Sequence, residues 1–198
     1  MLKEMKIVKK QQEILENLLK FLPFGPNLIT LLSLVVAIFA VYFIFINNIL
    51  GAFLILISFV LDFLDGAIAR AKKQTTALGA YLDGMTDRFV EFLVLFPFII
   101  FDWSRVPAII ILFFGTCMHS FSKAYADHRR LLKTQEVLEI KSLFGRKERG
   151  LSLIGAVFLY LLDFVDYSYY LFWIGAFLSI IGFLFLEYKI YQKVKEKL

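Results

Sequence analysis

Four aspartates lie within a short stretch of otherwise apolar sequence. They form two pairs, Asp62 with Asp65 and Asp83 with Asp87, and the members of each pair are three and four positions apart. On a helix, these spacings place both side chains of a pair on one face. A charged side chain in the middle of a membrane costs at least about 2.5 kcal/mol, so clustered acids are tolerated where they bind cations or line a wet cavity. The pattern predicts that this stretch is the functional site.

The two acidic pairs flank a short basic segment, so they are expected to meet at similar depth on neighbouring helices. Carboxylate oxygens are the ligands that Mg²⁺, Mn²⁺ and Ca²⁺ prefer. With one cysteine and two histidines in the chain, no Cys/His set accompanies the acids as zinc would require. Four converging carboxylates therefore predict a site for two divalent cations, which in such centres lie about 3.5–4 Å apart.

Small residues separate the two acidic pairs. Gly66, Ala69 and Gly79 leave little side-chain volume, so a flat base or a diphosphate can approach the backbone closely. The same residues also serve close helix packing in membranes. Arg70 has two interpretations as well, a contact to phosphate or a topology anchor at the inner face.

The composition is that of an integral membrane protein. Of the 198 residues, 60% are hydrophobic, and the mean hydropathy is +0.73, which is too apolar for a soluble domain. A membrane-spanning helix needs about 20 mostly apolar residues. We therefore predict an all-α membrane protein with six transmembrane helices, the fifth being short. The six apolar ranges are 28–46, 49–68, 77–101, 106–125, 151–165 and 169–186.

Basic residues collect at both ends of the chain and in the segments after the second and fourth predicted spans. The loops expected on the other side contain a single basic residue, Arg105. Because Lys and Arg gather on the cytoplasmic side, both termini and the acidic cluster are predicted to be cytoplasmic, in a multi-pass protein of the cell membrane. The net charge of +5 then reflects topology and attraction to anionic headgroups, and nucleic-acid binding is not expected.

One transmembrane domain preceded by an interfacial helix is predicted. Residues 1–22 alternate apolar side chains with Lys and Glu, which indicates an amphipathic interfacial helix or a solvated basic arm, without the pattern of a cleaved signal. Residues 23–198 form the six-helix transmembrane catalytic domain, whose first helix Asn27 is expected to cap. The long polar interval 127–149 is expected to contain a short helix within 131–144, at the rim of the site.

The motif Asp-x2-Asp-Gly-x2-Ala-Arg-x8-Gly-x3-Asp-x3-Asp resembles the signature of the CDP-alcohol phosphatidyltransferase family, and every fixed position is filled. The resemblance implies a phospholipid-synthesising enzyme. Such enzymes transfer a phosphatidyl-type group from a CDP-linked lipid to an alcohol and release CMP. It also implies two divalent cations, Mg²⁺ or Mn²⁺, and a homodimer. Whether the lipid is a diacylglycerol or an archaeol, or the donor a smaller CDP-alcohol, stays open.

The resemblance assigns roles by position. It implies that all four aspartates hold the metals, with Asp87 also the general base. The segment Pro26–Thr30 resembles one that opens the first helix in these enzymes. The residues implied to bind the CDP moiety are Asp62, Asp65, Gly66, Ala69, Arg70, Gly79 and Asp83, together with Asn27 and Thr30.

Basic residues at the inner ends of the fourth and fifth predicted spans favour an anionic acceptor. Lys123, Arg146 and Arg149 suit a phosphorylated alcohol such as inositol phosphate, although the positive-inside rule also explains them. The segment 121–127 and the arginine pair resemble inositol-phosphate-using members, with Lys123 in place of their arginine and Asp127 in place of their glutamate. Glycerol phosphate, serine and other alcohols remain alternatives.

Two other classes of protein fit parts of the pattern. A divalent-cation or proton-coupled transporter would distribute its acids through the membrane depth, whereas these gather near the inner face, with Glu91 the main extension. A non-catalytic membrane scaffold leaves the complete motif unexplained. Glu91 is expected to pair with Arg88 or Lys123, and His119 is expected to be a packed residue and not a metal ligand.

Overall fold

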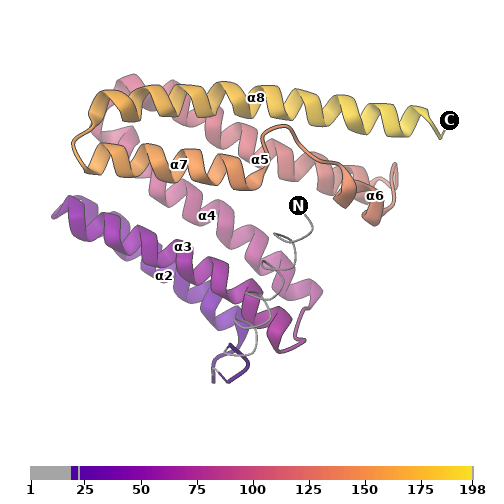
Figure 1. Cartoon of the computed structure of the whole chain (residues 1–198), viewed down its shortest axis with the longest axis horizontal. Coiled ribbons are helices and arrows are strands. Elements are labelled where there is room, and N and C mark those ends of the chain that lie inside the picture. The colour runs from indigo at the N-terminus through magenta and orange to yellow at the C-terminus, as the bar shows by residue number, and fades with distance from the viewer. Residues whose placement is uncertain (1–18, 22, 198) are drawn as a thin grey trace, which may run out of the picture. The chain divides into compact units, whose positions relative to one another are not determined.

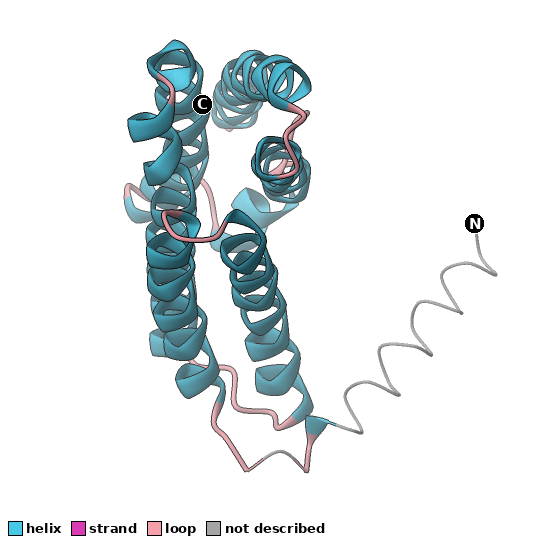
Figure 2. Cartoon of the chain, turned by 90° about the vertical axis from the view of Figure 1, so that its left-hand side faces the viewer, coloured by secondary structure: helices cyan, strands magenta, loops and turns pink. Residues whose placement is uncertain are grey.

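The computed structural model of the chain describes residues 19–21 and 23–197, and these residues form helices joined by loops (Figure 2). The all-helical class is thereby confirmed. The predicted interfacial helix at 1–22 lies almost entirely outside the described residues. The helices are α2 (Pro26–Ile44), α3 (Asn48–Ala71), α4 (Ala77–Phe101), the 3-10 turn η1 (Trp103–Arg105), α5 (Val106–His128), α6 (Thr134–Glu139), α7 (Arg146–Leu161) and α8 (Val165–Lys195).

Four stretches of helix among the described residues are long and apolar enough to cross a membrane, which confirms the membrane character of the chain. They are Pro26–Ile44, Asn48–Ala71, Trp103–His128 and Val165–Lys195. Helices also occupy the third and fifth predicted spans. However, α4 carries the charges of the acidic motif, and α7 is 16 residues long. Six spans therefore remain a prediction.

Several helices extend beyond the apolar ranges predicted as spans. The fifth helix, α7, begins at Arg146 and not at 151, and α8 runs from Val165 to Lys195 and not from 169 to 186. Hydropathy locates only the apolar centre of a helix, whereas Lys, Glu and Gln at its ends are good helix formers. Asn27 does not cap α2, because the helix begins at Pro26, a favoured first position, after the N-cap residue Gly25.

The chain divides into two compact units, and the first ends at Val94, within α4. In this unit α2 and α3 lie side by side (Figure 1). Small buried residues line their contact, and the Ser58 hydroxyl of α3 donates to the main-chain oxygen of Ser33 on α2 at 2.8 Å. Small side chains let the two backbones approach closely, which is how helices associate in a membrane.

A tight turn after α3 directs the chain back into α4. Lys73 adopts a left-handed conformation (φ 55°), and the N–H groups of Lys73 and Gln74 donate to the carbonyls of Arg70 and Ala69 at 3.1 and 2.9 Å. These bonds form a Schellman motif, a common end of a helix. The Thr76 hydroxyl then accepts from the Gly79 N–H at 3.0 Å in the first turn of α4. The turn thus brings the acidic pair of α3 and the acidic pair of α4 close to each other.

The second unit begins at Leu95 and contains the end of α4 and the helices α5 to α8. Within it, α8 packs along both α5 and α7 (Figure 1). Aromatic rings fill one part of its core, where the centroid of Phe98 lies 5.0 Å from that of Tyr160 and 5.9 Å from that of Phe172. The Phe98–Tyr160 contact is edge-to-face, and such a contact stabilises the packing beyond the apolar area that it buries.

Arg105 is the largest fully buried side chain in the described part of the second unit, with 2% of its surface exposed. Its Nη2 atom donates to the Val165 carbonyl oxygen at 2.8 Å, and its guanidinium forms an ion pair with Asp102. The guanidinium carbon also lies 5.1 and 5.7 Å from the ring centroids of Tyr160 and Tyr169. One side chain therefore joins η1 to α7 and α8.

We expect the substitution Arg105→Ala to destabilise the protein by about 2 kcal/mol, because it removes a buried charge that three elements share. The loss of stability should be smaller than for a fully buried ion pair, since Asp102 is 30% exposed and can be hydrated. Thermal unfolding of the detergent-solubilised protein measures the effect. The control Arg105→Lys keeps the charge but loses the planar guanidinium group. Its unfolding temperature should therefore lie between those of the unaltered protein and Arg105→Ala. Equal unfolding temperatures for all three proteins would contradict the prediction.

Candidate metal site

Three of the four aspartates of the motif come together in the first compact unit. Asp62 from α3 and Asp83 and Asp87 from α4 each offer one carboxylate oxygen, and these oxygens all lie within 4.8 Å of one another. Asp87 is buried, with 7% of its surface exposed. Negative groups so close repel one another unless a cation lies between them. An all-oxygen donor set of this kind fits a hard divalent ion.

Asp65 lies beside this cluster and makes a different contact. Its carboxylate is buried, and its Oδ2 atom accepts a hydrogen bond from the Thr30 hydroxyl of α2 at 2.5 Å. The Thr30 hydroxyl also lies 3.2 Å from the Pro26 carbonyl oxygen. The structure thus groups three of the predicted metal ligands and shows the fourth bonded to a neighbouring helix. The sequence pattern gave no sign of this bond, because its partners are 35 positions apart.

A cavity of about 230 Å³ lies next to the acids and is lined in part by Asp65 and Asp83. Every residue predicted to bind the CDP moiety lines it except Asp62, which belongs to the carboxylate cluster. Sequence reasoning missed part of the lining, because four of these positions are unspecified in the motif and the fifth lies at the start of α2. The missed lining residues are Pro26, Gln74, Thr75, Thr76 and Ala80.

The glycines of the motif keep this cavity open. A methyl group added to Gly79 would lie 3.1 Å from the Thr76 hydroxyl and 3.2 Å from the Asn27 side-chain oxygen. One added to Gly66 would lie 3.3 Å from the guanidinium of Arg70. These neighbours are polar side chains of the cavity wall and not the backbone of another helix. Of the two interpretations of the small residues, the geometry therefore favours space for a ligand at Gly66 and Gly79.

A cation of α4 lies beside the cluster. The guanidinium of Arg88 forms an ion pair with Glu91 at 2.7 Å, and another of its nitrogens lies 3.8 Å from Asp87. The predicted pairing of Glu91 is therefore confirmed for Arg88. The positive charge partly offsets the negative charge of the cluster on its Asp87 side.

The residues predicted to bind an acceptor lie in the second unit. The Lys123 ammonium donates to the Ile140 carbonyl oxygen at 2.8 Å, and the guanidinium of Arg149, which is 5% exposed, donates to the Phe144 carbonyl oxygen at 2.8 Å. Arg146 begins α7, and its side chain lies outside the described part of the structure. Two of the three predicted cations thus bind one short segment after α6.

His119 is a packed residue, as predicted. It is 4% exposed, and its Nδ1 and Nε2 atoms lie 2.8 Å from the Gly115 carbonyl oxygen and 2.9 Å from the Ser142 hydroxyl. Both ring nitrogens therefore have partners within the second unit.

Residues 24–181 match the family model of the CDP-alcohol phosphatidyltransferases. The chain therefore belongs to the CDP-alcohol phosphatidyltransferase family, which confirms the family that the aspartate motif indicated.

Three relatives share a substantial part of the sequence. The chain is 30% identical over 139 residues to a bifunctional IPC transferase and DIPP synthase of Aquifex aeolicus, which covers 66% of this chain but 32% of that protein. It is 34% identical over 161 residues to an uncharacterized protein of the same bacterium, 76% of this chain and 79% of the relative. It is 29% identical over 121 residues to archaetidylinositol phosphate synthase of Pyrococcus horikoshii, 61% of this chain and 64% of that protein. The chain thus spans about a third of the bifunctional relative.

Solved structures share the fold. The phosphatidylinositol phosphate synthase of Mycobacterium tuberculosis, in complex with manganese and citrate, has a TM-score of 0.72 and 24% identity, over 91% of this chain and 88% of that chain. Its structure with CDP-DAG bound has a TM-score of 0.71 and 23% identity, over 91% and 92% of the two chains. At this identity, the likeness establishes the fold.

The bond between Thr30 and Asp65 leads to a prediction about metal affinity. Partners that orient a metal ligand typically contribute about 10–100-fold to the affinity. We expect Thr30→Val, which removes the hydroxyl, to weaken Mn²⁺ binding by at least about tenfold. Electron paramagnetic resonance of free Mn²⁺ measures this without a catalytic assay. Thr30→Ser keeps the hydroxyl and should bind Mn²⁺ like the unaltered protein. If the Thr30→Val and Thr30→Ser variants bind Mn²⁺ equally well, Asp65 is not part of the metal site.

Proposed function

We propose that this protein transfers a phosphatidyl-type group from a CDP-linked lipid to the hydroxyl of a small phosphorylated alcohol, inositol phosphate, and releases CMP. The observation that carries the proposal is the folding of the family motif: three of its four aspartates meet in one cluster, beside a cavity lined by Asp65, Asp83 and the other motif residues. The donor's diphosphate would lie at the acids and its nucleoside in the cavity.

The residues fit the chemistry of this transfer. A bond forms between the acceptor oxygen and the lipid-side phosphorus, the bond from that phosphorus to the CMP oxygen breaks, and the acceptor's proton is taken up. Phosphoryl transfer depends mainly on positioning and charge stabilisation. The four aspartates would hold two cations, Mg²⁺ or Mn²⁺, which when bound neutralise the diphosphate. Asp87 would accept the proton, and Arg70, which lines the cavity, would contact phosphate.

Inositol phosphate is supported as the acceptor by both chemistry and relatives. Lys123 and Arg149 both donate to main-chain carbonyl oxygens of the short segment 140–144 in the second unit, each at 2.8 Å. Two cations so close favour an anion between them or beside them. The similar proteins from Pyrococcus and Mycobacterium are named as synthases of inositol phosphate lipids. A neutral acceptor such as serine offers no net negative charge for Lys123 and Arg149 to bind.

The membrane arrangement completes the proposal. The protein would cross the cell membrane six times, with both termini and the active site on the cytoplasmic side, and would act as a homodimer. The distribution of Lys and Arg supports the orientation, and the four long apolar helices support insertion. The transporter alternative is less favoured, because the three clustered acids lie beside a cavity built from the motif and not along a path.

A substrate panel tests the function. The purified protein would be incubated with CDP-diacylglycerol or CDP-archaeol and with inositol phosphate, glycerol phosphate, serine or inositol, and the lipid product and CMP would be measured. We expect the highest turnover with inositol phosphate. Good turnover with glycerol phosphate but not with inositol phosphate would reject the acceptor. No CMP release from any pair, with Mn²⁺ uptake into protein-containing vesicles, would favour transport.

A further inference from the structure

The segment that follows α6 contacts three basic side chains at alternate residues. An extended backbone turns alternate residues toward the same side, so a short segment can bind several groups in a row. The three contacts join α5 and α7 to one stretch of main chain. They are Lys123 Nζ to the Ile140 carbonyl at 2.8 Å, His119 Nε2 to the Ser142 hydroxyl at 2.9 Å, and Arg149 Nη1 to the Phe144 carbonyl at 2.8 Å.

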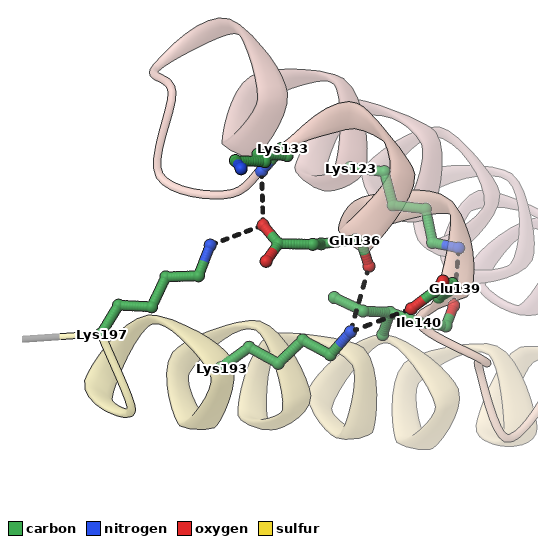
Figure 3. A network of polar contacts seen from close by, with 7 residues as sticks. All are labelled: Lys123, Lys133, Glu136, Glu139, Ile140, Lys193 and Lys197. Carbon is green, nitrogen blue, oxygen red and sulfur yellow. Dashed lines mark hydrogen bonds and ion pairs between the residues drawn. The ribbon is translucent and has the colours of Figure 1, made fainter.

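The start of α6 is tied to the end of α8 through Glu136 (Figure 3). One oxygen of the Glu136 carboxylate accepts from the Lys133 main-chain N–H at 2.7 Å and from the Lys197 ammonium at 2.5 Å. The Lys193 ammonium lies 3.3 Å from the Glu136 carbonyl oxygen. The same figure shows the Lys123 ammonium at the Ile140 carbonyl, one residue beyond the end of α6. Glu136 thus connects α8 to the segment that holds the cations.

Apolar packing alone does not fix this segment. Val137 and Ile140 are buried with Leu186 and Ile190 in one core cluster, which places α6 against α8. The hydrophobic effect is not directional, however, so it leaves the rotation and the sliding of a helix of 6 residues weakly determined. The charged contacts of Glu136 are directional, so they restrict the rotation of α6 and its position along α8.

We propose that Glu136 is a positioning residue for the acceptor: by fixing α6 on α8, it places the Ile140 and Phe144 carbonyls that orient Lys123 and Arg149 toward the acceptor's phosphate. This inference rests on the proposed function, in which these cations bind that phosphate. An ammonium has three donors and a guanidinium five, so one bond to a carbonyl leaves donors for a phosphate. Cations held in place before binding lose less conformational freedom when the acceptor binds.

The charge of Glu136 supports this role at neutral pH. The hydrogen bond from Lys197, and then that from the Lys133 N–H, lower the pKa of Glu136 from its ordinary value of 4.5. A lowered pKa means that the carboxylate stabilises this contact above its ordinary pKa and loses the effect as the pH falls through the lowered one. The charged groups around it are Lys193 on α8, Lys197 just beyond the end of α8, and Lys133 before α6. The contact is therefore intact throughout the range in which the enzyme would work.

Kinetics of the full-length protein in lipid nanodiscs test the inference. We expect Glu136→Ala to raise the KM for inositol phosphate about tenfold, and to change kcat and the KM for the CDP-lipid by less than about twofold. Glu139→Ala is the matched control, since Glu139 lies on the same helix and its carboxylate is 3.9 Å from Lys193. This control should leave all three constants within about twofold.

A second variant shows whether the effect passes through α8. Lys197→Met should also raise the KM for inositol phosphate. The double variant should have no higher KM than Glu136→Ala alone, because the effects of coupled groups are not additive. An unchanged KM in Glu136→Ala, or equal losses in kcat, both KM values and unfolding temperature, would overturn the inference. If Glu136→Ala does not fold, the KM of Lys197→Met decides it. Inactivity of the unaltered protein with every acceptor would instead count against the proposed function.

Discussion

Replacing Asp87 by asparagine is expected to reduce CMP release by a factor of about 10³ or more, since loss of a general base alone typically costs about 10²–10⁴. The side chain is buried, and its carboxylate belongs to the group of three within 4.8 Å. An amide of the same shape cannot accept the acceptor's proton, and it is a weaker ligand for a hard cation. The shape is retained, so the unfolding temperature should change by no more than about 4 °C.

Two matched variants separate the roles of Asp87. Glu91→Gln removes a carboxylate one turn further along α4, outside the cluster, and should reduce the rate by less than about tenfold. Asp83→Asn removes a proposed metal ligand but leaves the proposed base in place, so raised Mn²⁺ should restore part of its activity, whereas Asp87→Asn should stay inactive at any Mn²⁺ concentration. Activity of Asp87→Asn within tenfold of the unaltered protein would exclude Asp87 as the base.

Local geometry explains why the acidic cluster was predictable. Spacings of three and four residues determine which side chains share a helix face. A short turn between α3 and α4 then brings the end of α3 close to the start of α4. The sequence therefore placed Asp62, Asp83 and Asp87 together without knowledge of any distant contact, and the structure agrees. The close contact of Gly66 with Arg70 likewise lies within one segment, whereas Gly79 also faces Asn27 of α2, which the spacing of the motif does not reveal.

Contacts between distant parts of the chain were not predictable in this way. The bond from Thr30 to Asp65 joins residues 35 positions apart, and the bond from Lys197 to Glu136 joins residues 61 positions apart. Neither leaves a periodic signal, because a single polar pair does not repeat along a helix. The role of the stretch 131–144 was open for the same reason. Its short helix was expected, but its attachment to α8 depends on tertiary packing.

Removal of divalent cations is expected to lower CMP release by at least about 10³-fold, because the cations supply most of the charge stabilisation in phosphoryl transfer. The protein itself should stay folded, since its buried core is largely apolar and helical and does not depend on the ions. Treatment with a chelator, followed by return of Mn²⁺ or Mg²⁺, measures the effect. We expect either ion to restore the rate, because the three clustered carboxylates offer only oxygen ligands.

The shape of the Mn²⁺ dependence then tests the number of ions. Two cations that must both be present give a sigmoidal dependence of rate on concentration, whereas one gives a hyperbola. Asp65 makes the distinction informative: its carboxylate is bonded to Thr30 and lies outside the group of three. If Asp65→Asn turns a sigmoidal dependence into a hyperbolic one, Asp65 holds the second ion. A hyperbola for the unaltered protein, together with one bound Mn²⁺ per chain by metal analysis, would limit the site to one cation, held by Asp62, Asp83 and Asp87.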